Sequence, residues 1–391
     1  MALPTCLEEG VSISKATLVH KSNAHLPSEN GALGHLKLHN IHSPFNSYKI
    51  FQHLDHLKEF LDESQRYLIT PITVEIHPTN RCNLRCKDCT FQDADRTKEI
   101  DFATLSRTAQ EIIDLKTVKA IVWSGGGEPT LSRGLVNSAN LFGQAKIEQG
   151  IATNGTSITD EFIETVVRFF TYVRISLNAA SSKSYLEMHA VDKFGIVLSN
   201  IERLRQKRDQ AKDNRLTLGS SFLVYPENYQ EISRAIKNAD DLGLDYIQIK
   251  PAVLGQRVES FEFLHHAYCE LSNSLLDHIK TAIMVDCEKF QDLQSHNYGR
   301  NYSTCWGALF YATIAADKNV YICCHKIGDK KCAYGYLDDE SFQNIWLSNR
   351  KRDVLQSMDV SHCPPNCKFH KINNVLQDLY DSQFAEHKNF L

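Results

Sequence analysis

Short apolar runs alternate with amphipathic stretches through the middle of the chain. Between these runs, apolar positions recur at helical spacing at 102–115, 160–170, 197–209 and 228–243. Strands that alternate with helices pair in parallel through right-handed crossovers. The pattern predicts an α/β fold whose sheet is either doubly wound or curled into a full or partial barrel, with function at the carboxyl ends of the strands. The six strand-like runs lie at 72–76, 120–123, 150–153, 172–177, 216–225 and 246–250.

The regions on either side of this alternation have a different composition. Residues 1–42 are rich in Ser, Asn, His and Gly, and apolar spacing predicts one amphipathic helix over 47–66. The region 301–370 is cysteine-rich and short of apolar residues, as in small modules that a bound metal stabilises. The predicted organisation is a loosely ordered tail at 1–42, a helical lead-in at 43–70, the main domain at 71–255, a helical linker at 256–300, the cysteine-rich domain at 301–370 and a C-terminal helix at 371–391.

Composition and charge limit the class of protein. The 391 residues are 42% hydrophobic and 23% charged, and 43 Lys and Arg against 47 Asp and Glu leave a net charge of −4. This balance argues against nucleic acid or an acidic membrane as the main partner, and one basic stretch at 202–215 is interpreted as a solvated helix face. No apolar run is long enough for a transmembrane helix, and the N-terminus does not resemble a secretory signal. We therefore expect a cytoplasmic protein without a membrane partner.

Twelve cysteines are the compositional exception. In a reducing compartment, clustered cysteines indicate metal binding or redox chemistry rather than disulfides. Cys82, Cys86 and Cys89 follow the first predicted strand directly, at spacings of four and three. A structural zinc site takes four ligands, whereas three thiolates can hold an iron–sulfur cubane whose fourth iron keeps an open position. The triplet therefore favours a [4Fe–4S] cluster.

The segment CNLRCKDC resembles the radical S-adenosylmethionine (radical SAM) superfamily, and the resemblance extends over about 72–250 through WSGGGEP, ATNG and RISLNA in the expected order. It implies a partial (β/α)6 TIM-like barrel with a [4Fe–4S] cluster on Cys82, Cys86 and Cys89. One departure is Asp88, because many members carry an aromatic residue there; Phe91 is a candidate substitute. The residues implied to bind S-adenosylmethionine (SAM) are Gly125, Gly126, Gly127, Glu128, Thr153, Asn154, Ser176 and Asn178.

The resemblance also implies a reaction. The open iron chelates the amino and carboxylate groups of SAM, and one electron from a donor such as flavodoxin or ferredoxin cleaves its carbon–sulfur bond. The resulting 5′-deoxyadenosyl radical abstracts a hydrogen atom from the substrate. The cofactors carry the difficult chemistry, while the protein positions the reactants and excludes water.

A second group of cysteines lies late in the chain, at Cys305, Cys323, Cys363 and Cys367. A hairpin over ATIAADKNVYICC, with Asn319 in a left-handed conformation at its ADKN turn, would bring the first pair together. The region resembles the SPASM/twitch extension of radical SAM enzymes, in the shorter form with one auxiliary [4Fe–4S] cluster. Cys324 remains an alternative ligand to Cys323, and a zinc knuckle remains an alternative to the cluster. Cys332 is a candidate hydrogen donor to a substrate radical.

Other polar residues near strand ends are candidates for contact with the substrate, although strand alternation sends half of such side chains away from the interior. They are Glu75, His77, Arg174, Gln248 and Lys250, with Tyr185 and His189 after the fourth strand.

The leading hypothesis is a radical SAM enzyme (oxidoreductase, epimerase or lyase) in natural-product biosynthesis. Its substrate is expected to be a sugar, aminocyclitol or nucleotide sugar that is dehydrogenated, epimerised or dehydrated. The alternative is a maturase of a ribosomally made peptide. An iron–sulfur electron carrier or zinc-held scaffold, and a nucleic-acid modifying enzyme, are weaker alternatives.

Overall fold

The computed structural model describes residues 46–212, 215–252, 279–286, 299–364 and 367–384, together with a few positions between 263 and 293 and residue 386. The predicted tail at 1–42 and most of the predicted linker at 256–300 lie outside the described residues. Cys6, Cys269 and Cys287 lie outside them as well.

A single curved sheet organises the described chain. Its strand order is β10-β9-β8-β1-β2-β3-β4-β5-β6-β7, and β1 to β7 all pair in parallel. The six predicted strands are confirmed. β7 was not predicted and falls inside the stretch that we expected to be helical from its apolar spacing. The parallel strands are β1 (Thr73–Ile76), β2 (Ala120–Trp123), β3 (Glu148–Thr153), β4 (Tyr172–Ser176), β5 (Thr217–Val224), β6 (Tyr246–Pro251) and β7 (Ala282–Val285).

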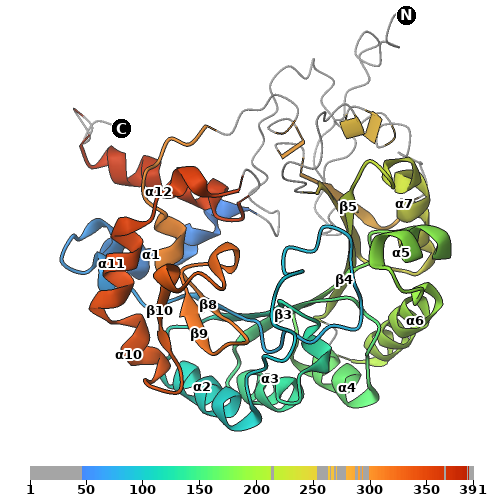
Figure 1. The fold of residues 1–391 in the computed structure, drawn as a ribbon, viewed down its shortest axis with the longest axis horizontal. Coiled ribbons are helices and arrows are strands. Elements are labelled where there is room, and N and C mark those ends of the chain that lie inside the picture. Colours follow the sequence, from blue (N-terminus) through green and yellow to red (C-terminus); the bar gives the residue numbers. More distant parts are fainter. Residues whose placement is uncertain are drawn as a thin grey trace, which may run out of the picture.

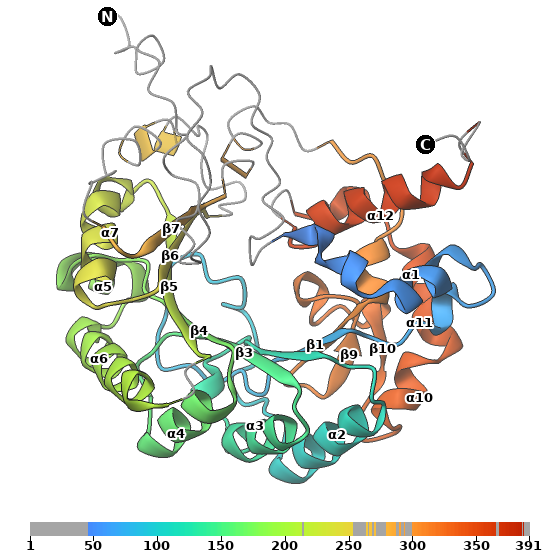
Figure 2. The ribbon, with the colours of Figure 1, turned by 180° about the vertical axis from the view of Figure 1, so that it is seen from behind.

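Helices cover the outer face of this sheet, and the sheet remains open, as a partial barrel (Figures 1 and 2). Polar N-caps mark where helices begin: Asp101 accepts a hydrogen bond from the backbone N–H of Thr104, and Thr159 accepts one from that of Phe162. Four of the helices were predicted, and α3 and α5 are additional. The six are α2 (Phe102–Asp114), α3 (Leu135–Gln144), α4 (Asp160–Phe169), α5 (Ser182–His189), α6 (Phe194–Gln210) and α7 (Ile232–Asp241).

The two faces of the sheet differ in polarity. Val74, Ile121 and Val173 are fully buried, on the face that the helices cover. Successive strand residues point to opposite faces, so Glu75 and Arg174 point to the inner face. Two glycines make room there for aromatic rings: a Cβ at Gly150 would lie 2.0 Å from the Tyr172 ring, and one at Gly219 would lie 2.3 Å from the Tyr246 ring. The interior of the barrel is therefore lined by polar and aromatic side chains.

The C-terminal region extends the same sheet. β8 (Tyr311–Ile314) pairs in parallel with β1, and β9 (Asn319–Tyr321) and β10 (Ala333–Tyr336) continue the sheet in antiparallel pairing. The predicted hairpin is confirmed, but the left-handed residue is Lys318, with φ of 65°, rather than Asn319. The remaining helices are α10 (Phe342–Trp346), α11 (Asn349–Ser357) and α12 (His370–Ser382).

The lead-in is shorter and more broken than the predicted helix over 47–66. A 3₁₀ turn over Ser47–Gln52 precedes α1 (Leu54–Leu61), and the helix ends at Asp62. Phe60 is fully buried, with its ring 5.3 Å from that of Trp306. The lead-in therefore packs against the C-terminal region, as Figures 1 and 2 show for α1 and α12.

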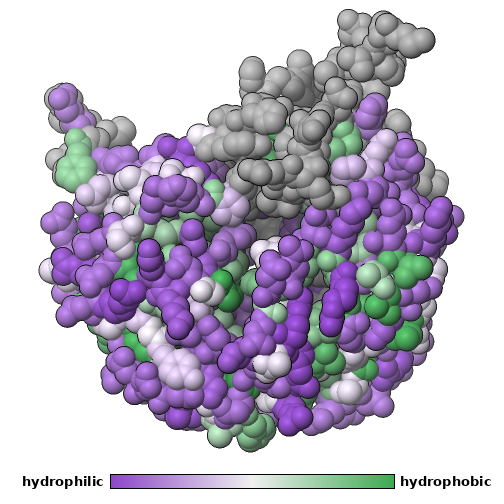
Figure 3. All heavy atoms as spheres, in the orientation of Figure 1, coloured by the Kyte–Doolittle hydropathy of each residue, from purple (hydrophilic) through white to green (hydrophobic). Residues whose placement is uncertain are grey.

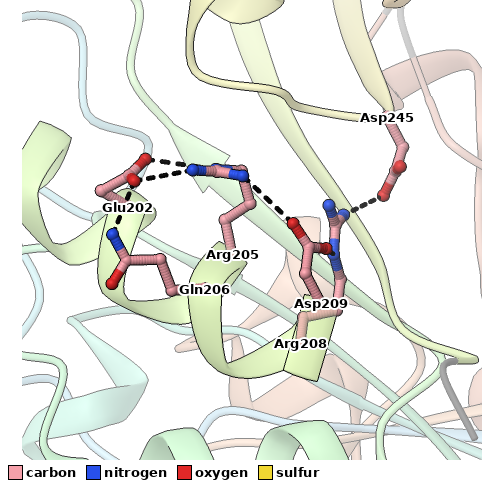
Figure 4. Close-up of polar contacts among 6 residues, drawn as sticks. All are labelled: Glu202, Arg205, Gln206, Arg208, Asp209 and Asp245. Atoms are coloured by element: carbon pink, nitrogen blue, oxygen red, sulfur yellow. Dashed lines mark hydrogen bonds and ion pairs between the residues drawn. The ribbon is translucent and has the colours of Figure 1, made fainter. Parts of the chain in front are cut away.

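The basic stretch at 202–215 lies mainly on the outer helix α6, and carboxylates neutralise its arginines (Figure 4). Arg205 pairs with Glu202 at 2.7 Å and with Asp209 at 3.1 Å. Arg208 pairs with Asp245 at 2.6 Å. The pairs of Arg205 fit the interpretation of a solvated helix face, whereas Arg208 is buried.

Hydrophilic side chains predominate on the face shown in Figure 3, and hydrophobic ones gather there only in small separate groups. Within the described part of the chain, no helix combines the length and the apolar character needed to cross a membrane.

Candidate active site

The first three cysteines lie together on the loop that joins β1 to α2. The pKa of Cys86 is raised to about 12, mainly by burial and to a smaller extent by the neighbouring thiolates of Cys82 and Cys89. Burial likewise raises the pKa of Cys82, to which Cys89 contributes. The three thiols therefore lie within electrostatic range of one another on this loop.

Arg96, which the sequence analysis missed, holds this loop against the glycine-rich segment after β2. Its guanidinium donates hydrogen bonds to the carbonyl oxygens of Asn80 (3.2 Å), Gly126 (2.9 Å) and Phe91 (3.1 Å). Its positive charge also acts to lower the pKa of Cys82 and Cys86. Arg96 thus positions the loop and favours the thiolate form of its cysteines.

Asn83 joins the cysteine loop to the end of β3. Its amide nitrogen donates to the hydroxyls of Thr156 (2.7 Å) and Ser157 (3.0 Å), and its amide oxygen accepts from Asn154 at 2.9 Å. The loop is therefore anchored at a residue between two of the three cysteines.

His189, at the end of α5, contacts the triplet directly. Its Nδ1 lies 3.0 Å from the sulfur of Cys86, and its Nε2 lies 2.8 Å from the carbonyl oxygen of Leu177. A carbonyl oxygen only accepts, so the neutral imidazole carries its proton on Nε2 and accepts from the thiol of Cys86. Tyr185 is fully buried, with its ring centroid 4.3 Å from that of His189.

The glycines of WSGGGEP allow a close approach of the chain to itself. A Cβ at Gly126 would lie 2.3 Å from Oδ1 of Asn80, and one at Gly127 would lie 2.2 Å from the carbonyl oxygen of Arg81. The cysteine loop can pass this close only because side chains are absent there. These glycines therefore fix the loop, whatever else they contact.

Glu128 is 2% exposed, and its carboxylate is used within the protein. Oε1 accepts from the backbone N–H of Thr130 (3.0 Å) and from the hydroxyls of Thr130 (2.8 Å) and Thr153 (2.6 Å), while Oε2 accepts from the N–H of Asn154 at 2.7 Å. Burial raises its pKa, while these hydrogen bonds act to lower it. Glu128 thereby joins the segment after β2 to the end of β3.

The other residues implied to bind SAM divide into two kinds. The amide oxygen of Asn178 accepts from the N–H of Leu223 at 2.9 Å, and its φ of 52° turns the chain after β4. Ser176 is half-buried, and its hydroxyl has no hydrogen-bond partner among the described residues. Asn178 therefore supports the framework, whereas Ser176 is available to a ligand.

The departure at position 88 has a structural counterpart. Asp88 adopts a φ of 53°, immediately before Cys89. The ring of Phe91 lies 5.6 Å from that of His77, edge to face, and packs toward Gly126. Phe91 thus lies between the cysteine loop and the glycine-rich segment.

The late cysteines also come together. Burial raises the pKa of Cys305 to about 12, with contributions from Cys367 and Cys363. Burial, and then the thiolates of Cys324, Cys305 and Cys367, raise the pKa of Cys323. Asn373 of α12 donates to the sulfur of Cys305 at 3.7 Å. Hydrogen bonds of this kind to cysteine sulfur tune iron–sulfur clusters, so the surroundings fit such a group.

Cys324 and Cys332 have different neighbours from the four predicted ligands. Burial raises the pKa of Cys324 to about 11, and its charged neighbours are Lys368, Glu75 and Cys367. The thiol of Cys332 donates to Asp329 at 3.4 Å and lies near Cys363. Within the described chain, no three His, Cys, Asp or Glu side chains are arranged to hold a single metal ion in common.

Charged residues of the inner wall form a buried ion pair. Glu75 on β1 pairs with Lys368, and His77 lies 3.2 Å from its other carboxylate oxygen. Burial alone would raise the pKa of Glu75, but the charge of Lys368, with a smaller contribution from the adjacent His77, holds it below its usual range. This is the face of the sheet that the crossover helices do not cover.

Comparison with known proteins supports this picture. Residues 76–239 match the model of the Radical SAM superfamily. The chain is 24% identical over 169 residues to the tungsten-containing aldehyde ferredoxin oxidoreductase cofactor-modifying protein of Pyrococcus furiosus, covering 43% of this chain and 48% of that protein. It is 28% identical over 182 residues to the pre-heme d1 synthase of Dinoroseobacter shibae, covering 46% and 43%. The chain thus spans about half the length of the curated relatives it matches.

Solved structures share the fold at low sequence identity. Streptococcus suis SuiB bound to S-adenosylmethionine is 15% identical with a TM-score of 0.59, covering 85% of this chain and 78% of that one. The enzyme anSMEcpe with bound AdoMet and Cp18Cys peptide is also 15% identical, with a TM-score of 0.54, covering 78% and 88%. Residues 76–239, which include the three-cysteine loop after β1, thus match the radical SAM domain, the domain of a superfamily of enzymes that use a [4Fe–4S] cluster and SAM.

Proposed function

We propose that this chain cleaves SAM and abstracts a hydrogen atom from a small polar substrate such as a sugar, aminocyclitol or nucleotide sugar. The observation that carries the proposal is the gathering of Cys82, Cys86 and Cys89 on a loop that the protein ties to the ends of β2 and β3. When bound, the cluster and SAM together supply the one-electron cleavage that yields a 5′-deoxyadenosyl radical. The outcome is dehydrogenation, epimerisation or dehydration, because each begins with hydrogen abstraction.

The residues of the chain hold and position these groups. Cys82, Cys86 and Cys89 would hold the cluster, and Arg96 would offset part of the negative charge of their thiolates. Asn83 and Glu128 keep the loop in register with the ends of the neighbouring strands. The free hydroxyl of Ser176, on the inner face at the end of β4, is the side chain best placed to contact SAM.

A single auxiliary [4Fe–4S] cluster on Cys305, Cys323, Cys363 and Cys367 completes the proposal. The electrostatic coupling of these thiols supports the set. Cys323 is preferred to Cys324 because its neighbours include both Cys305 and Cys367, whereas Cys324 lies beside the Glu75–Lys368 pair. Such a cluster would accept an electron from the substrate in a dehydrogenation.

The names of the curated relatives support a small substrate. They include the pre-heme d1 synthase and a probable GTP 3′,8-cyclase of Saccharolobus islandicus, which is 26% identical over 187 residues. The polar inner wall of the barrel suits a hydrophilic molecule. A peptide maturase is the second candidate, favoured by the likeness to SuiB bound to the precursor peptide SuiA, with a TM-score of 0.59 at 16% identity.

The decisive experiment is an anaerobic assay of reconstituted protein with SAM and a strong reductant, following 5′-deoxyadenosine. The triple variant Cys82→Ala/Cys86→Ala/Cys89→Ala is the control, and iron is counted in both samples. Product from the wild type alone supports the proposal. Absence of product from fully loaded, reduced enzyme, tested with sugars, nucleotide sugars and peptides, contradicts it. Tight binding of a leader peptide without turnover of any sugar favours the maturase.

A further inference from the structure

Two basic residues of the inner wall have no acidic partner among the described residues. Arg174 on β4 donates one hydrogen bond, to the amide oxygen of Gln248 at 3.3 Å, and its buried Nε has no partner. Lys250 on β6 is half-buried and makes neither an ion pair nor a hydrogen bond within the described chain. Other lysines of this wall are paired: Lys368 with Glu75, and Lys289 and Lys371 with Asp286 at 3.4 and 3.2 Å.

The strand register places these two residues on one surface. Lys250 follows Gln248 by two positions on β6, so both side chains leave the same face. Arg174 reaches Gln248 across β5, where the residue paired with Arg174 is Gly219. Arg174 and Lys250 therefore flank Gln248 from two different strands.

Without a bound anion, the positive charges of Arg174 and Lys250 are unfavourable in this partly buried environment. The charged groups that affect Lys250 are Arg174 from β4, and Asp286 and Lys289 from the segment that begins directly after β7. Burial, followed by the charges of Arg174 and Lys289, lowers the pKa of Lys250 to about 7, and Asp286 offsets this only in part. Desolvated cations are unfavourable unless a counter-charge accompanies them. The described acids of this wall, Glu75 and Asp286, already have cationic partners.

We propose that Arg174 and Lys250 bind an oxyanion group of the substrate, either a phosphate or a carboxylate. The planar guanidinium matches both groups with two parallel hydrogen bonds, and the lysine supplies a point charge. That the anion belongs to the substrate rests on the proposed function. Within that proposal, the excess of positive charge favours a nucleotide sugar, a sugar phosphate or a sugar acid, and disfavours a cationic aminocyclitol.

Calorimetric titration of the reconstituted protein at pH 8 tests the site with two probes, pyrophosphate and succinate. The variants are Arg174→Gln and Lys250→Met. Matched controls on the outer helices are Arg168→Gln and Lys207→Met, whose side chains line a different, outer surface. We expect saturable binding of at least one of the two anions, weakened at least tenfold in either inner variant and less than twofold in either control. The stronger probe identifies the anion as phosphate or carboxylate.

A second readout is the proton balance. Because the pKa of Lys250 is about 7, binding of an anion at pH 8 should draw a proton onto its amine, and Lys250→Met should abolish this uptake. Thermal denaturation verifies that each variant is folded. Arg174→Lys retains the positive charge and should keep part of the affinity for the anion.

Binding of neither anion, or equal weakening in inner and outer variants, overturns the inference. The 5′-deoxyadenosine assay depends on the cysteines and separates the two proposals. Formation of 5′-deoxyadenosine without anion binding overturns the anion site alone, whereas anion binding by protein that never cleaves SAM contradicts the proposed function alone.

Discussion

The ammonium group of Lys368 is ion-paired with the carboxylate of Glu75, although the two residues are 293 positions apart in the sequence. Lys368 directly follows Cys367, one of the late cysteines, and Glu75 lies within β1, two residues before the loop that carries the first cysteines. The Glu75 side chain is 8% exposed and that of Lys368 is 30% exposed. This pair joins the C-terminal region to the interior of the barrel.

Replacing one residue of this ion pair should therefore lower the free energy of unfolding more than replacing both. Lys368→Met leaves the buried carboxylate of Glu75 without its main counter-charge, and we expect the free energy of unfolding to fall by about 3–5 kcal/mol. The double variant Glu75→Gln/Lys368→Met should recover part of that loss, because no uncompensated charge remains. Urea denaturation of the three proteins gives the comparison. A loss below about 1 kcal/mol in Lys368→Met would show that the pair is solvated.

The first cysteines should be needed for cleavage of SAM but not for the second cluster. Alanine at Cys82, Cys86 or Cys89 should abolish 5′-deoxyadenosine and remove roughly four irons per chain, one cubane. Cys332→Ala is the matched control and should retain both the iron and 5′-deoxyadenosine, because its thiol lies near Cys363 rather than near the triplet. Iron content that is unchanged in the triplet variants would exclude this loop as a cluster site.

The late cysteines should stabilise the C-terminal region. Cys305→Ser or Cys363→Ser should remove roughly four irons per chain and lower solubility, because metal binding is coupled to folding in small modules. The decisive comparison is Cys323→Ser against Cys324→Ser, measured by iron content and electron paramagnetic resonance. We expect loss in the first and retention in the second. The reverse result would assign Cys324 as the ligand.

Glu128 should matter as a structural acceptor. In Glu128→Gln, an NH₂ group replaces one carboxylate oxygen. An NH₂ group cannot accept a hydrogen bond, so the N–H or hydroxyl groups that donate to that oxygen lose their partner. We expect a loss of about 1–3 kcal/mol of stability. Glu202→Gln, in the exposed network of Figure 4, should change stability much less, because solvent screens that ion pair. Equal effects of the two substitutions, measured by urea denaturation, would show that the buried network contributes little.

Lys250 should make stability depend on pH. Its pKa is about 7 in the folded protein against an ordinary value of 10.5, so between these values the unfolded chain binds more protons and stability rises with pH. Without a bound anion, Lys250→Met should be more stable than the wild type by about 1–3 kcal/mol near pH 6, a figure reduced because the side chain is partly exposed. The advantage should shrink as the pH approaches 10.

Lys351, whose pKa burial also lowers to about 7, is present in both proteins and cancels in their difference. Denaturation curves at several pH values provide the measurement. A stability difference that does not change with pH would mean that Lys250 is charged at neutral pH in the folded protein.

Much of the framework follows from short-range patterns in the sequence. The six apolar runs correctly predict β1 to β6, because strand formation there depends on residues within a few positions of one another. The spacing of Cys82, Cys86 and Cys89 likewise predicts a cluster-binding loop without reference to distant residues. β7 escaped prediction because its run of four residues lies in a region with helical spacing, and Lys318 rather than Asn319 takes the left-handed turn position.

Partnership between distant residues was decided only by the tertiary structure. Nothing near Arg96 in the sequence indicates that its guanidinium binds the carbonyl of Gly126, and Glu128 has partners that lie beyond the next helix. Arg174 and Lys250 could be named from the sequence, but their lack of an ion-pair partner among the described residues could not. Local patterns in the sequence predict the strands and most of the helices, because these depend on adjacent residues. Folding alone determined which charges are paired, since that depends on which strands meet.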